Sequence, residues 1–225
     1  MNNAAFFAAL RGSGPFGVSL TKGQVEGCEV ILSASERLPI EHRAYLLATA
    51  AHETAFTMQP VRETLASSDA QAVARLDRAW GGGKLPWVSR PYWRFDHGGR
   101  AWLGRGYVQL THRENYERAS VNLGVDLLAD PNLAMQPNIA AQILVRGCTE
   151  GWFTGKKLSD YLPGDYLNAR RVVNGTDRAA QIARYARNFE AALRAGATAP
   201  VPTPRAPSFW AGIINFIRNI FGGNK

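Results

Sequence analysis

The fold of this chain depends on residues 40–64, which read IEHRAYLLATAAHETAFTMQPVRET. Four apolar residues recur there at helical spacing: Ile40, Ala44, Leu47 and Ala51. They predict a helix over 40–53 with one buried stripe. Pro60 lacks a backbone donor and disfavours helical geometry at the residue before it, so the chain must turn there.

This bend separates two acids, Glu53 and Glu63, that have unlike surroundings. Glu53 ends the predicted helix among alanines, where the helix dipole and the low polarity both disfavour a charged carboxylate. A continued helix would carry Glu63 about 15 Å away on another face, whereas a turn returns it to face Glu53 across a groove. Such a pair can divide general acid and general base work on a glycoside. The structural alternative is a paired or capped Glu53 and a solvated Glu63, and for two arbitrary acids this alternative is the favoured one.

Composition indicates a globular protein with a real core. The chain has 225 residues, of which 46% are hydrophobic, enough for one domain or one domain with an appendage. A net charge of +8 attracts polyanions, which include nucleic acid, anionic lipid and acidic wall polymers, and charge alone does not choose among them. Cys28 and Cys148 form no C-x-x-C pair; we expect reduced thiols, and a single disulfide is the alternative.

Most of the chain is predicted to be helical, which indicates a mainly α fold. Further helices are expected over 22–37, 68–79, 112–123, 138–149, 166–173 and 178–194, the last stopping at Gly196. Residues 4–10, AAFFAAL, are too short for a signal peptide core and are expected to pack on the domain. Residues 81–111 are rich in glycine and proline and predict a small loop-rich lobe with a short hairpin.

A second informative stretch is GRGYVQLTHRENY, residues 104–116. Its glycines allow a close backbone approach, and three uncharged side chains can bind sugar hydroxyls, acetamides or a water: Gln109, Thr111 and Asn115. Three aromatic side chains in and before it offer flat faces for a sugar ring: Trp93, Trp102 and Tyr107. The alternative is a hairpin that leads into a helix capped by Thr111, with Glu114 completing a capping box.

Other chemistries are less well supported. His52-Glu53 begins a zinc-protease pattern, but the second histidine is missing because position 56 is Phe. The other histidines lack ligand spacing, so we predict no metal and no cofactor, although scattered ligands for a zinc amidase stay an alternative. Cys148 lies in an apolar helical context and is interpreted as a structural thiol.

Taken together, the motifs resemble glycoside hydrolase family 19, and in particular its phage and prophage endolysins. They are AAHETA, QPVRET, GRGYVQLTHRENY and VVNG at 172–175, and the resemblance covers residues 1 to about 195. It implies a two-lobed, lysozyme-like helical domain and an inverting hydrolase of β-1,4-linked N-acetylated sugars. Relatives often have two adjacent acids where this chain has Arg62 and Glu63, so Glu63 is the only candidate for the second acid.

The resemblance also assigns roles to residues. It implies that Glu53 is the general acid and Glu63 the base, and that Thr111 helps to hold the nucleophilic water. It implies a sugar cleft lined by polar side chains, which we expect to be Gln109, Asn115 and Asn174, with Tyr107, Trp102 and His52 beside them. The family includes chitinases and muramidases, and the short, cysteine-poor domain favours peptidoglycan over chitin.

The composition shifts after residue 196. Residues 197–208 contain four prolines and no acid and predict an extended linker. Residues 209–225 predict a cationic amphipathic helix, about 20 Å long over its 13-residue apolar part, which is too short to span a bilayer. The side chains expected to contact an anionic membrane or lipopolysaccharide are Phe209, Trp210, Ile213, Phe216, Ile217 and Arg218. The alternative is that this helix folds back onto the catalytic domain.

These observations predict a monomeric endolysin that cleaves peptidoglycan glycan strands and binds no nucleic acid. Without a signal peptide it is expected to accumulate in the bacterial cytoplasm until a holin-type pore releases it to the wall. Two alternatives stay open: a chitinase, and a cationic membrane-disrupting protein whose sugar-binding domain is not catalytic.

Overall fold

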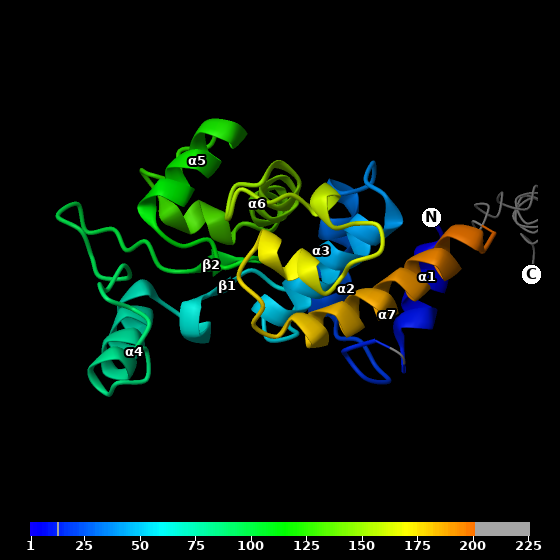
Figure 1. The fold of residues 1–225 in the computed structure, drawn as a ribbon, viewed down its shortest axis with the longest axis horizontal. Helices are drawn as coiled ribbons and strands as arrows, with labels where there is room; N and C mark the ends of the chain where they lie inside the picture. Colours follow the sequence, from blue (N-terminus) through cyan, green and yellow to red (C-terminus); the bar gives the residue numbers. More distant parts are fainter. Residues whose placement is uncertain (13, 201–225) are drawn as a thin grey trace, which may run out of the picture.

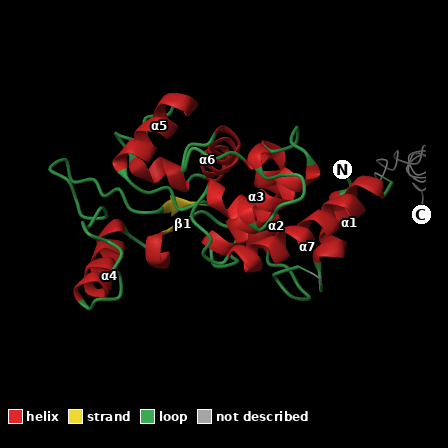
Figure 2. Ribbon diagram, viewed as in Figure 1, coloured by secondary structure: helices red, strands yellow, loops and turns green. Residues whose placement is uncertain are grey.

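The structure is a computed structural model that describes residues 1–12 and 14–200. Helices dominate these residues, as predicted (Figure 2). The α-helices are α1 (Asn3–Leu10), α2 (Lys22–Ala34), α3 (Ile40–Glu53), α4 (Asp69–Gly81), α5 (Arg113–Leu123), α6 (Pro137–Glu150) and α7 (Ala179–Thr198). Short 3-10 helices are η1 (Glu63–Leu65), η2 (Pro131–Met135), η3 (Leu158–Asp160) and η4 (Asn168–Val172). The helix expected over 166–173 is therefore only the short η4.

Helix α3 is the centre of the larger lobe. It packs against α7, α2 and α6, and every residue from Ala44 to Ala51 is buried, so more than the predicted single stripe is covered. The alanines make this possible because they let neighbouring helices approach on several sides. Thr54 closes the helix by donating its Oγ1 hydroxyl to the Ala50 carbonyl at 2.7 Å. Glu53 is therefore the last helical residue, as predicted.

Helix α7 crosses both α3 and α1 (Figure 1). The predicted stop at Gly196 is wrong, because α7 continues to Thr198. Gly196 instead allows α1 to pack closely. A Cβ at Gly196 would lie 3.0 Å from the Phe6 Cβ. The Gly196 carbonyl accepts a 2.9 Å hydrogen bond from the Asn2 N–H. Helix α1 packs on the domain as expected, with Phe6, Phe7 and Leu10 buried.

A second, smaller lobe contains α4 and the loops up to residue 103 (Figure 1). Its own apolar cluster comprises Ala66, Ala72, Leu76, Trp93, Ala101 and Leu103. Strands β1 (Val61–Arg62) and β2 (Arg105–Gly106) pair antiparallel where the chain enters and leaves this lobe, with Val61 opposite Gly106 and Arg62 opposite Arg105. The short hairpin predicted inside 81–111 is present as antiparallel bridges between Phe95 and Ala101 and between Arg105 and Leu110. The β1–β2 pairing, which joins residues more than 40 positions apart, was not predicted.

Three further expectations concern the cysteines, the membrane and the tail. Cys28 and Cys148 are buried free thiols, as expected. In the described part of the chain, no helix has the length and apolarity needed to cross a bilayer. The amphipathic segment 209–225 and most of the predicted linker lie outside the described residues, including Phe209, Trp210, Ile213, Phe216, Ile217 and Arg218.

Candidate active site

A cavity of about 380 Å³ lies between the two lobes' connecting segments and the end of α3. Five of the predicted site residues line it: Glu53, Glu63, Gln109, Thr111 and Asn174. Tyr92, Val108 and Val173 complete the lining. The structure therefore brings both acids and Thr111 to one cavity, although 48 residues separate Glu63 from Thr111 in the sequence. Two carboxylates on one polar cavity can divide the work of proton donor and proton acceptor.

Glu63 is held by one donor on each carboxylate oxygen. The Tyr92 hydroxyl donates to Oε1 at 2.7 Å, and the Gly104 N–H donates to Oε2 at 2.7 Å. Burial, and then the Glu63 charge, raise the pKa of Tyr92 well above its usual value, so the phenol stays a neutral donor. Hydrogen bonds to a charged acceptor are short and strong, and these two fix the orientation of the carboxylate.

The backbone of Gly104 is tied to Glu63 in both directions. The Glu63 N–H donates to the Gly104 carbonyl at 2.7 Å, while the Gly104 N–H reaches the Glu63 side chain. A Cβ at Gly104 would lie 2.7 Å from the Gln109 Oε1. The predicted close backbone approach is thus present at this glycine.

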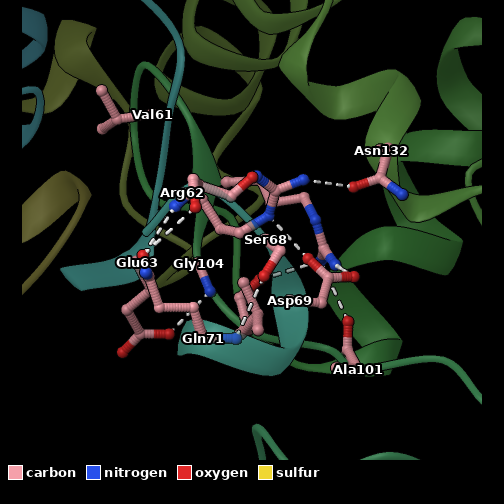
Figure 3. Close-up of polar contacts among 12 residues, drawn as sticks. Val61, Arg62, Glu63, Ser68, Asp69, Gln71, Ala101, Gly104 and Asn132 are labelled. Atoms are coloured by element: carbon pink, nitrogen blue, oxygen red, sulfur yellow. Dashed lines mark hydrogen bonds and ion pairs between the residues drawn. The ribbon is translucent and has the colours of Figure 1, made fainter. Parts of the chain in front are cut away.

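The structure also shows the role of Arg62, the residue before Glu63. Its side chain extends away from Glu63, toward Asp69 and Asn132 (Figure 3). The Nε–Oδ1 distance to Asp69 is 2.6 Å, and the Nη2–Oδ1 distance to Asn132 is 2.8 Å. Arg62 is therefore part of the scaffold, and Glu63 is the acid at this position that lines the cavity.

Glu53 has a partner that sequence reasoning missed. Arg170 in η4 donates from Nη1 to Glu53 Oε1 at 2.8 Å, and the arginine side chain is only 3% exposed. Its Nε donates to the Asp177 carbonyl at 3.1 Å. The helix dipole and the alanines are thus an incomplete account of the surroundings of Glu53. The one available signal was the position of Arg170, two residues before the VVNG motif.

His52 is half-buried beside Glu53 but does not line the cavity. Burial is the main cause that lowers the pKa of His52; Arg170 and Arg178 act in the same direction, and Glu53 and Asp177 oppose them. The imidazole is therefore neutral at neutral pH.

Thr111 lines the cavity and does not cap α5. The residue before that helix is His112, which makes no side-chain cap bond, so the capping alternative is wrong. Asn115 donates from Nδ2 to the Thr111 carbonyl at 3.0 Å and does not line the cavity. The Gln109 amide donates from Nε2 to the Val61 carbonyl at 3.0 Å, which leaves its oxygen directed toward Gly104.

The prediction that Trp93, Trp102 and Tyr107 offer their rings to a sugar is wrong. Trp102 is 7% exposed and Tyr107 0%, and both belong to the main core. Trp93 is also 0% exposed and fills the small-lobe core. A lobe rich in glycine has few other side chains with which to build a core, so its aromatics are used for packing. Tyr92 is the aromatic residue at the cavity, and the sequence did not single it out.

Several residues near the cavity have strained backbone conformations. Outside glycine, positive φ angles occur in the described residues at Ala55, Phe56, Met58, Thr64, Leu65, Gln109, His112 and Arg178. The first seven lie within a few residues of Glu53, Glu63 or Thr111. Such conformations cost about 1–3 kcal/mol each and persist only where surrounding contacts hold them. Here α2 helps to hold the loop after Glu53, since Gln24 donates to the Phe56 carbonyl at 2.9 Å.

Residues 46–157 match the family model for chitinase class I, glycoside hydrolase family 19. The fold is similar to chitinase C from Streptomyces griseus HUT6037, with 20% identity over 90% of this chain and 78% of that one and a TM-score of 0.53. A chitinase C mutant aligns at 20% identity over 90% of this chain and 95% of that one, with a TM-score of 0.45. No curated protein shows significant sequence similarity to the chain.

Proposed function

Because the chain belongs to glycoside hydrolase family 19 through residues 46–157, we propose that it is a muramidase of the endolysin type. Membership of this family makes it a glycosidase. The proposal adds the bond, which is the β-1,4 linkage between N-acetylmuramic acid and N-acetylglucosamine in peptidoglycan, and an inverting acid/base mechanism.

The observation that supports the mechanism is the single cavity lined by Glu53, Glu63 and Thr111. When Glu53 carries a proton, it donates that proton to the glycosidic oxygen as the bond to the anomeric carbon breaks. Glu63 accepts a proton from a water that Thr111 helps to hold, and that water attacks the opposite face of the sugar. The product is a new reducing end, with Glu53 left ionised and Glu63 protonated until solvent exchanges the protons.

The fixed orientation of Glu63 suits the role of a base. Tyr92 and Gly104 each bind one of its oxygens, so the carboxylate does not have to be ordered as the reaction proceeds. Gln109 and Asn174 line the same cavity and offer amide groups to sugar hydroxyls and acetamides.

Peptidoglycan is preferred as the substrate because the chain carries a net charge of +8 and the bacterial wall is polyanionic. We further propose release to the wall through a holin-type pore after accumulation in the cytoplasm, and binding of residues 209–225 to anionic lipid or lipopolysaccharide. Chitin is the second candidate substrate, favoured by the fold similarity to a protein named chitinase C.

Mass spectrometry of digested peptidoglycan tests the proposal. A muramidase yields muropeptides with a reducing N-acetylmuramic acid end, and soluble chitin oligomers stay intact or are cleaved slowly. Reducing N-acetylglucosamine ends, anhydro sugars or freed peptides would each assign a different activity. Rapid cleavage of chitin oligomers with intact peptidoglycan would replace the proposal with the chitinase.

A further inference from the structure

Two arginines face each other directly on the strand pair behind Glu63. Arg62 in β1 and Arg105 in β2 are paired residues of the antiparallel register. Like charges directly opposite on a sheet destabilise it, and the Arg105 side chain is 0% exposed. A buried guanidinium without a counter-charge is costly, so this pairing requires an anion.

Asp69 supplies that anion to both arginines, and Figure 3 shows its contact with Arg62. Its Oδ1 accepts from Arg62 Nε and its Oδ2 from Arg105 Nη2, each at 2.6 Å. Asp69 is the first residue of α4, next to the cap residue Ser68, where the helix dipole favours an acid. One carboxylate therefore joins the start of α4 to both strands.

Each arginine is adjacent in sequence to one partner of the hydrogen bond between Glu63 and Gly104. Arg62 precedes Glu63, and Arg105 follows Gly104, whose N–H binds Glu63 Oε2. Arg105 Nη1 further donates to the Leu103 carbonyl at 3.3 Å and to the Tyr116 hydroxyl at 2.8 Å, so the segment before Gly104 is fixed as well. A shift of either strand changes the Glu63–Gly104 contact.

We infer that Asp69 is a positioning residue, which holds Glu63 in its reactive orientation by bridging Arg62 and Arg105. The inference rests on the proposed function, in which Glu63 acts on the attacking water. Asp69 does not line the cavity and contacts no reacting group. Because misplacement by about 1 Å can cost roughly 100-fold in rate, the substitution Asp69→Asn is expected to lower kcat by about 10- to 100-fold with little change in KM.

The Gly104 amide proton gives a readout that does not depend on activity. Its resonance in a two-dimensional ¹H–¹⁵N NMR spectrum reports the hydrogen bond to Glu63, and Glu63→Ala gives its position when the acceptor is missing. In Asp69→Asn the resonance is expected to move toward the Glu63→Ala position. Glu41→Gln is the matched control: Glu41 also lies in the first turn of a helix and also pairs with an arginine, Arg194, at 2.6 Å, but it is not bonded to Arg62 or Arg105. Its Gly104 resonance and kcat should remain those of the wild type.

Each result decides the inference. A moved resonance with a reduced kcat supports it, whereas an unmoved Gly104 resonance, or a moved one with full kcat, overturns it. If Asp69→Asn does not fold, Arg62→Gln replaces it, because Asp69 and Arg105 stay paired in that variant. The Gly104 resonance is then expected to shift in the same direction by a smaller amount, and no shift overturns the inference. Rates are measured on whichever of peptidoglycan or chitin hexamer the wild type cleaves. Should it cleave neither, the proposed function fails, and the resonance alone decides whether Asp69 orients Glu63.

Discussion

Arg170 and Glu53 form an ion pair at 2.8 Å across 117 residues of sequence. The contact joins the last residue of α3 to η4 and places a buried cation beside the proposed general acid. Any substitution of Glu53 therefore changes two properties at once: the proton donor in the cavity and the counter-charge of a guanidinium that is only 3% exposed. Activity and stability must be measured together to separate them.

Glu53→Gln is expected to lower the release of reducing ends by at least about 100-fold, because the amide cannot donate the required proton. The unfolding free energy should fall by about 1–3 kcal/mol, since Arg170 loses a charged partner but keeps an acceptor. Reducing-sugar assays and urea unfolding measure the two effects.

The control for this experiment is Glu150→Gln. Glu150 is also the last residue of a helix and also pairs with an arginine, Arg146, at 2.7 Å, but it does not line the cavity. The Glu150→Gln variant should release reducing ends at the wild-type rate. Bacterial killing that persists unchanged in Glu53→Gln would favour the alternative in which the tail, and not hydrolysis, causes lysis.

Tyr92→Phe is expected to lower kcat roughly tenfold, because Glu63 loses one of its two fixed donors and a hydrogen bond to a charged group contributes about 1.5–3 kcal/mol. Tyr166→Phe is the matched control. It removes a 2.8 Å bond from a tyrosine hydroxyl to Glu190, and neither of these two residues lines the cavity. Equal losses in the two variants would contradict the assigned role of Tyr92.

Gly27→Ala is expected to destabilise the protein by about 3 kcal/mol and to reduce activity. The new Cβ would lie 1.7 Å from the Met58 carbonyl oxygen, and Met58 belongs to the strained loop that follows Glu53. Gly23→Ala lies on the same helix and meets only the Gln59 side chain at 3.4 Å, so it should be neutral or stabilising by up to about 1 kcal/mol. Thermal unfolding of both variants checks this, and a stable, active Gly27→Ala protein would refute the packing argument.

Stability is expected to fall as the pH drops below about 6.5. Burial is the first cause that lowers the pKa of both His42 and His52 from the usual 6.5. The unfolded chain therefore binds more protons than the folded one between the folded pKa values and 6.5, and the unfolding free energy decreases as the pH falls through that window. Urea unfolding at pH 7.5 and pH 5 measures the difference. The difference in unfolding free energy between the two pH values should be smaller in the His42→Gln, His52→Gln double variant. If the double variant shows the same difference as the wild type, the effect belongs to other groups.

Removal of residues 201–225 is expected to spare hydrolysis of isolated peptidoglycan and to reduce binding to anionic liposomes. The cut belongs after Pro200, because the Pro200 carbonyl accepts a hydrogen bond from the Asn2 side chain at 2.6 Å, and an earlier cut would disturb α1. Co-sedimentation with vesicles is the measurement. Undiminished binding by the shortened protein would exclude the tail as the membrane contact.

Much of this architecture followed from local spacing. Apolar periodicity predicted α3 with its correct ends, and the proline at position 60 predicted the bend that returns Glu63 toward Glu53. The glycines of residues 104–106 indicated a close backbone approach, which Gly104 makes. These features are encoded by residues near one another in the chain, because helix periodicity and proline geometry act over a few positions.

Long-range packing settled the rest. Whether an aromatic ring faces a sugar or fills a core depends on what folds over it, so Trp102 and Tyr107 could not be assigned from composition. Tyr92, Arg170 and Asp69 reach their partners from segments 29, 117 and 36 residues away. No local rule specifies such contacts, because their free energy depends on burial and charge neutralisation that exist only once the two lobes have packed.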